Sequence, residues 1–143
     1  MAYGALVTRT VPVPRAKLWA LLADFGAIGK QMGDSVESCT LDGSGVGAVR
    51  RVKARGVAGE MVERLDAALP DRLIVYSIVA PTSLPLEHYT AVVTLDDAPG
   101  GACAIEWGSH WVAKGAPEDS VRRMLTGLYN RLIDALVRAA SEG

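Results

Sequence analysis

The sequence predicts an α+β protein in which a curved antiparallel sheet of seven strands surrounds a long C-terminal helix, with two short helices after the first strand. Short apolar runs separated by turn residues follow one another through the middle of the chain, which is typical of strands joined by hairpins. Apolar residues recur at helical spacing near the N-terminus and again after residue 117. The length of 143 residues suits one domain covering 1–143.

The N-terminal third is expected to hold one strand and two helices. Alternation predicts the first strand at 3–11, and two prolines follow it. A helix is expected from Pro14 to about Phe25, because proline suits a first helical turn and leucines recur at helical spacing. A short helical turn is expected at 27–32.

Six further strands are expected before the last helix, each bounded by Gly, Pro or Asp. They are 35–41, 46–55, 60–67, 72–79, 86–95 and 102–113. A hairpin turn is expected at Asp42–Gly45, and a looser one at 96–101. From Glu118 to Ala140 apolar residues recur at steps of three and four, which predicts an amphipathic helix of about six turns.

Composition excludes several classes of partner. Fifteen basic residues stand against sixteen acidic ones, so we expect no nucleic-acid partner. Since no apolar run approaches the ~18 residues that a spanning helix needs, we expect no membrane association. The N-terminus lacks a signal-peptide pattern, and a cytoplasmic location is expected. Cys39 and Cys103 are too few for a disulfide framework and, with His88 and His110, fit no metal or cofactor motif, so we expect neither.

Several segments, in their order along the chain, resemble the Bet v 1-like or START-like (SRPBCC) superfamily, in particular its bacterial polyketide cyclase/dehydrase-like branch. The matching pieces are Val13-Pro14, Leu18-Trp19, Leu22, Asp24-Phe25, Glu63-Arg64-Leu65-Asp66, Leu84-Pro85 with Tyr89, and Glu106-Trp107. The stretch 59–79 is also similar to its counterpart in plant abscisic-acid receptors. The resemblance implies a helix-grip fold with an internal pocket for a small, largely apolar molecule, and it does not imply a particular reaction.

The chain departs from the receptor pattern at three places. The receptor gate is replaced by Ala54–Gly59, and the latch by Leu84–Leu86. The position of the receptor lysine that meets the hormone carboxylate falls at Glu37, which would repel a carboxylate. We therefore do not expect an abscisic-acid receptor, and Glu37 is kept as a ligand-binding position.

Strand alternation offers an acidic candidate. Met61, Glu63 and Leu65 share the more apolar face of their strand, so Glu63 should point inward. A carboxylate among apolar walls suits a general acid or base, or it binds a ligand, a water or a neighbouring cation without doing chemistry. Arg50 and Arg51 are adjacent, so one of them points inward; an inward Arg50 could pair with Glu37, Glu63 or Glu106.

The strand at 102–113 is ambiguous. Hydrophobicity alone places its tryptophan-bearing face inward, whereas the resemblance places Glu106 inward, together with Gly108 and His110. We follow the resemblance, which leaves the tryptophan face to be covered, and self-association as a homodimer is one way to cover it. Glu106 and His110 then join Glu63 as catalytic candidates.

The remaining candidates form the expected ligand-binding wall. They are Arg50, Val52, Met61, Tyr76, Ile78, Tyr89, Ala91, Gly108, Met124, Leu128 and Leu132. The two tyrosines offer an apolar wall and a hydroxyl to orient a ligand. The residues of the long helix are expected to form the pocket ceiling, or else they are ordinary core.

Three functions remain open from the sequence. The first is binding of a polyketide-, terpenoid- or lipid-like molecule in the internal cavity. The alternative is a cofactor-independent acid–base enzyme of the cyclase, dehydratase or aldol type, a lyase or isomerase, acting on such a molecule. The third is a protein-interaction role, in which the loop at 81–85 closes over the ligand and presents a surface.

Overall fold

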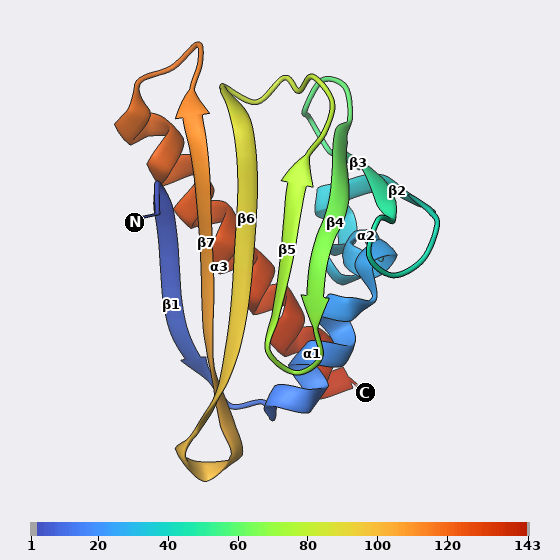
Figure 1. Ribbon diagram of the computed structural model, residues 1–143, viewed down its shortest axis with the longest axis vertical. Helices are drawn as coiled ribbons and strands as arrows, with labels where there is room; N and C mark the ends of the chain where they lie inside the picture. Colours follow the sequence, from blue (N-terminus) through green and yellow to red (C-terminus); the bar gives the residue numbers. More distant parts are fainter. Residues whose placement is uncertain (1–2, 143) are drawn as a thin grey trace.

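The computed structural model describes residues 3–142 and contains one seven-stranded antiparallel sheet in the order β1-β7-β6-β5-β4-β3-β2 (Figure 1). The strands are β1 (Ala5–Val11), β2 (Val36–Asp42), β3 (Val49–Ala54), β4 (Met61–Leu69), β5 (Leu73–Ile78), β6 (Leu86–Ala98) and β7 (Ala102–Ala113). The helices are α1 (Arg15–Ala23), α2 (Ile28–Gln31) and α3 (Glu118–Glu142), with short 3-10 turns at Phe25–Ala27, Gly33–Ser35 and Pro99–Gly101.

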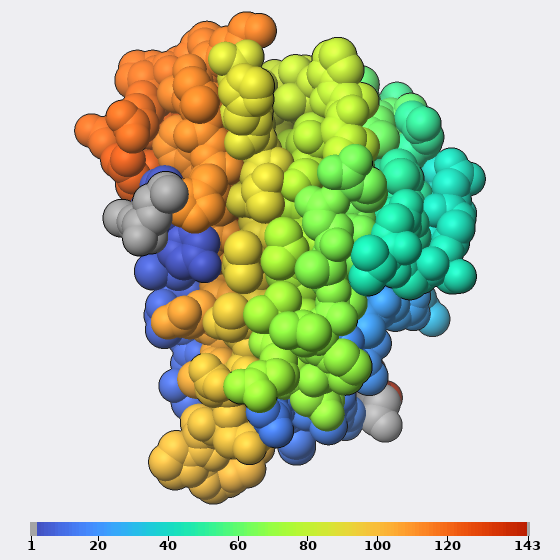
Figure 2. Space-filling view, viewed as in Figure 1, coloured from blue at the N-terminus to red at the C-terminus, as the bar shows by residue number. Residues whose placement is uncertain are grey.

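The sheet curves around α3, which runs obliquely across one face (Figure 1). In the space-filling view from the same side, the strands form the surface and hide most of that helix (Figure 2). The expected fold class is confirmed. Since β1 and β2 are the two edges of the sheet, the segment with α1 and α2 crosses from one edge to the other. No helix within residues 3–142 is long and apolar enough to cross a lipid bilayer.

Two element boundaries differ from expectation by three residues, and the others differ by two residues or fewer. Strand β3 begins at Val49 and not at 46, because Gly45 and Gly47 adopt positive φ angles of 66° and 95° that break the extended pairing. Strand β6 continues to Ala98, since its ladder with β7 pairs Asp97 with Cys103 and Ala98 with Ala102. The turn is therefore tighter than expected and occupies Pro99–Gly101.

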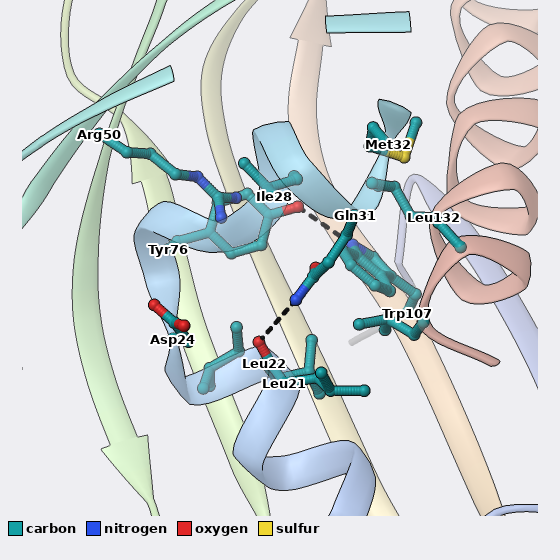
Figure 3. Close-up of a pocket in the computed structure, with 13 residues that line it drawn as sticks. Leu21, Leu22, Asp24, Ile28, Gln31, Met32, Arg50, Tyr76, Trp107 and Leu132 are labelled. Carbon is teal, nitrogen blue, oxygen red and sulfur yellow. Dashed lines mark hydrogen bonds between the residues drawn. The ribbon is translucent and has the colours of Figure 1, made fainter. Parts of the chain in front are cut away.

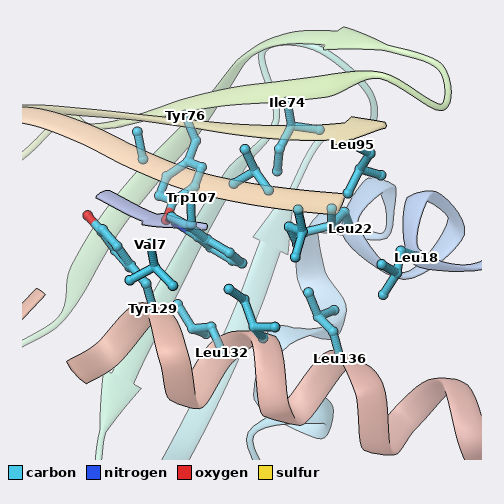
Figure 4. Packing of buried hydrophobic residues seen from close by; sticks show 14 of the residues in the cluster. Val7, Leu18, Leu22, Ile74, Tyr76, Leu95, Trp107, Tyr129, Leu132 and Leu136 are labelled. Carbon is cyan, nitrogen blue, oxygen red and sulfur yellow. Dashed lines mark hydrogen bonds between the residues drawn. The ribbon is translucent and has the colours of Figure 1, made fainter. Parts of the chain in front are cut away.

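The hydrophobic core lies between α3 and the half of the sheet formed by β1, β5, β6 and β7 (Figure 4). Alternate strand residues point into it, among them Val93, Leu95 and Ile105. From the helix, Tyr129 and Ile133 are almost completely buried. In contrast, β2 and β3 contribute no residue to this core cluster within the described chain.

The expected orientation of β7 is wrong. Trp107 and Ser109 point into the core, whereas Glu106 is exposed and His110 lies half-exposed on the outer face. The residues that alternate with Glu106 are large and apolar, and their burial against α3 outweighs the orientation taken from the resemblance. Gly108 also faces outward, where the ring of Tyr3 covers it. Because α3 covers the tryptophan face, no second subunit is needed to shield it.

Candidate ligand cavity

A cavity of about 590 Å³ lies between α3 and the concave face of β3, β4 and β5, with α2 closing one side. Its apolar wall consists of Ile28, Met32, Val36, Val52, Ala54, Val57, Met61, Ile78, Leu84, Met124, Leu125, Leu128 and Leu132. The volume is within the range of ~300–1,000 Å³ that small-molecule sites occupy. The cavity exists where β2 and β3 fail to contribute to the core, so the sheet there curves around empty space.

A buried ion pair forms the polar part of this wall. Nε of Arg50 donates to Oε1 of Glu63 at 2.7 Å, and the two residues are only 5% and 7% exposed. Arg50 and Glu63 are directly paired across β3 and β4, so alternation turns both inward. The exposed neighbours Arg51 and Arg64 face solvent for the same reason. The sequence left Glu37, Glu63 and Glu106 as possible partners of Arg50, and in the structure the partner is Glu63.

Further contacts fix the guanidinium of Arg50. Its Nη1 donates to the backbone carbonyl of Phe25 at 3.0 Å. The guanidinium carbon lies 3.9 Å from the centroid of the Phe25 ring. It lies 5.1 Å from the centroid of the Tyr76 ring, which is drawn beside Arg50 in Figure 3. These aromatic faces stabilise a desolvated cation. Within the described chain, neither Nη2 of Arg50 nor Oε2 of Glu63 has a hydrogen-bond partner, and neither atom is completely buried.

Three tyrosines and a serine continue the polar wall into the core. Tyr129 donates to Oγ of Ser109 at 2.6 Å, and the hydroxyls of Tyr89 and Tyr129 are hydrogen-bonded to each other. Since Tyr129 has one proton and gives it to Ser109, Tyr89 must be the donor in the second bond. The indole of Trp107 donates to the hydroxyl of Tyr76 at 3.1 Å.

Burial keeps these phenols protonated. Burial raises the pKa of Tyr129 to about 12, and hydrogen bonds with Ser109 and Tyr89 oppose this only partly. The pKa values of Tyr76 and Tyr89 are also raised well above the ordinary value, first by burial and then by neighbouring charge. At neutral pH all three side chains are therefore neutral hydroxyls.

Charged residues surround the outer part of the cavity. Asp34, Arg55 and Arg131 line it and are exposed to solvent. Arg55 donates to the backbone carbonyl of Asp34 at 2.7 Å, which connects β3 to the turn before β2. A far smaller void of about 20 Å³ lies beyond Arg50 and Tyr76, next to α1 and α2 (Figure 3), and has room for about one water molecule.

The structure places most of the sequence-predicted residues together. Those lining the cavity are Arg50, Val52, Met61, Glu63, Tyr76, Ile78, Tyr89, Met124, Leu128 and Leu132. Glu106, Gly108 and His110 lie on the opposite face of the sheet. Ala91 points inward but is fully buried in the filled part of the core.

Glu37 lies outside the cavity, which corrects its expected placement. It is exposed and lies 3.8 Å from both Lys53 and Arg55. An irregularity in the β2–β3 register between Val36 and Ser38 turns Val36 inward and leaves Glu37 outside. This bulge has no evident sequence signal.

Sequence reasoning missed the residues that close the sides. Ile28 and Met32 reach the cavity from the crossing segment, and Leu84 reaches it from the loop before β6. Arg131 lies three residues after Leu128 on α3, so helical spacing could have placed it on the same face. Tyr129 was also missed, although it follows Leu125 by four residues on the buried stripe.

Comparison with known proteins agrees with this architecture. The structure of a protein of unassigned function from Bacillus thuringiensis is 18% identical, with a TM-score of 0.79 over 95% of this chain and 97% of that one. Norcoclaurine synthase from Thalictrum flavum is 16% identical, with a TM-score of 0.80 over 96% of this chain and 86% of that one. The protein Ara h 8.0201 is 23% identical, with a TM-score of 0.80 over 96% and 97%. At these identities the likeness shows the fold.

Sequence comparison identifies the family. No curated protein sequence matches the chain. The model of the family described as polyketide cyclase/dehydrase and lipid transport matches residues 5–141, nearly the whole described chain. That family and the Bet v 1-like neighbours support the expected superfamily and a fold that binds hydrophobic ligands. The chain therefore belongs to the polyketide cyclase/dehydrase and lipid transport family.

Proposed function

We propose that this protein binds one small, largely apolar molecule in the cavity between α3 and strands β3 to β5. The observation that carries the proposal is a cavity of about 590 Å³ with a mainly apolar wall and one buried ion pair, Arg50–Glu63. An apolar ligand gains from burial there about 25 cal/mol per Å² of apolar surface removed from water. The ion pair gives such a ligand a preferred orientation.

The proposal can be tested with the neutral fluorophore N-phenyl-1-naphthylamine, whose emission rises in apolar surroundings. We expect saturable binding of one molecule per chain. Leu128→Trp places an indole in the cavity and should abolish most of this binding. Thr126→Trp introduces the same side chain on α3 at a position that does not line the cavity, so it serves as the matched control.

Two results would count against the proposal: absence of fluorophore binding to the wild-type protein, or equal binding by the Leu128→Trp variant. Near-ultraviolet circular dichroism establishes that each variant remains folded. Compounds that co-purify with the protein, identified by native mass spectrometry after extraction, would then give the chemical class of the natural ligand.

Acid–base catalysis in the same cavity is a second candidate. The observation that favours it is the second carboxylate oxygen of Glu63, a residue that lines the cavity. Among residues 3–142 this oxygen has no hydrogen-bond partner. If an extracted compound proves to be a substrate, Glu63→Gln should stop its turnover while its binding persists. Turnover that survives this substitution would remove Glu63 from the chemistry.

A further inference from the structure

We propose that the ligand carries a neutral hydroxyl group at its buried end and that this group binds between Arg50 and Glu63. This inference rests on the proposed function. Among the residues that the structure describes, each partner of the ion pair keeps one polar atom without a hydrogen bond: Nη2 of Arg50 is a donor, and Oε2 of Glu63 is an acceptor. A hydroxyl is the smallest group that can accept from the first and donate to the second.

Charge favours a neutral group over an ion. A ligand carboxylate at this position would gain from Arg50 but meet the Glu63 carboxylate, and an ammonium group would meet the opposite conflict. Both partners are more than nine-tenths buried, so water screens such a conflict poorly. A hydroxyl satisfies both atoms without adding charge to the cavity.

Most of the hydrogen-bonding capacity of the tyrosine hydroxyls is used within the protein, so the ion pair is the main polar group available to a ligand. The protons of Tyr89 and Tyr129 are committed within the protein, to Tyr129 and Ser109 respectively. The hydroxyl oxygen of Tyr76 already accepts from Trp107, so Tyr76 can add a donor for the ligand but is no second acceptor beside Glu63. Arg50 and Glu63 therefore present a free donor and a free acceptor from paired positions on adjacent strands.

Three probes that share an octylphenyl group separate the two hydrogen bonds. 4-Octylphenol can donate and accept, 4-octylanisole can only accept, and octylbenzene can do neither. Each is titrated by displacement of N-phenyl-1-naphthylamine, and each affinity is corrected for transfer of the compound from water to octanol. Since a net hydrogen bond to a charged group contributes roughly 1.5–3 kcal/mol, we expect each step from 4-octylphenol to 4-octylanisole to octylbenzene to weaken binding by at least about tenfold.

The Glu63→Gln variant should weaken the binding of one probe, 4-octylphenol. The amide oxygen of glutamine can replace Oε1 as the acceptor for Arg50, which places its NH₂ group where Oε2 was. A donor then meets the phenol proton, so 4-octylphenol should bind about tenfold more weakly, while octylbenzene binding is unchanged. Glu37→Gln is the matched control, because this exposed glutamate lies outside the cavity and should change none of the affinities.

The outcomes distinguish this inference from the proposed function. Equal corrected affinities for the three probes, or a Glu63→Gln variant that keeps the phenol preference, would overturn the hydroxyl site and leave the apolar cavity intact. If neither the three probes nor the fluorophore bind, both the hydroxyl site and the proposed function are contradicted. If Glu63→Gln does not fold, the wild-type series alone decides.

Discussion

The Arg50–Glu63 pair offers the sharpest test of the structure, through a double-mutant cycle on stability. Removal of one partner from a buried ion pair leaves an uncompensated charge and costs about 3–5 kcal/mol. Arg50→Met should lie at the upper end, because it also removes the hydrogen bond to the Phe25 carbonyl and the contacts with two aromatic rings. Glu63→Leu should lie at the lower end, because Arg50 keeps those contacts.

The combined variant Arg50→Met/Glu63→Leu should be no less stable than either single variant, because neither charge then remains unpaired. The two substitutions would thus be coupled by at least the larger of the two single costs, about 5 kcal/mol. The free energies of unfolding come from urea denaturation followed by circular dichroism. A wild-type stability above about 7 kcal/mol, within the usual range of ~5–15 kcal/mol, leaves each single variant with a measurable transition.

A surface pair supplies the control. Arg9 and Asp134 are 2.8 Å apart, but their side chains are 33% and 52% exposed, so their coupling should stay below about 1 kcal/mol. Additive effects of Arg50→Met and Glu63→Leu, each below about 1 kcal/mol, would refute the reasoning. They would mean that water reaches the pair and that the cavity lacks a desolvated polar end.

Further predictions concern packing and pH. Gly108→Ala should destabilise the protein by about 1–3 kcal/mol in thermal unfolding, because its Cβ would lie 2.8 Å from the Tyr3 ring. Gly127→Ala should stabilise it by ~0.5–1 kcal/mol, because the new Cβ meets only a flexible arginine end at 3.5 Å; destabilisation would contradict the helix placement. The folded-state pKa of Tyr129, about 12, exceeds the ordinary value of 10.0. The contribution of the protonated Tyr129 hydroxyl to the free energy of unfolding is therefore fully present below pH 10, and it should be lost as the pH rises towards 12. In the Tyr129→Phe variant, the free energy of unfolding from urea denaturation should decrease less with rising pH in this range than it does in the wild-type protein. An equal decrease in both proteins would contradict this prediction.

The elements that repeat a simple period could be predicted from sequence. The long helix α3 and the alternation of β4 follow from local spacing, and β4 alone suffices to point Glu63 inward. For β7 the apolar alternation also indicated the correct face, and the resemblance overrode it. The burial of Trp107 shows that, in this strand, apolar area decides orientation.

The remaining cavity residues depend on information that local patterns lack. Ile28 and Met32 reach the cavity because their segment must cross the sheet from β1 to β2, which requires the complete strand order. Glu37 faces solvent because of a one-residue irregularity in pairing. The choice of Glu63 as the partner of Arg50 likewise depends on the β3–β4 register and not on either strand alone.

The uneven core bears on how the molecule fluctuates. Since β2 and β3 contribute nothing to the main hydrophobic cluster, little apolar contact opposes their local opening, and their amide protons should exchange with solvent before those of β6 and β7. A bound apolar molecule would supply the missing contacts at this end of the sheet. Its protective effect on hydrogen exchange would therefore be concentrated in β2, β3 and β4, because the bound ligand would provide there the apolar contacts that side chains provide in the rest of the core.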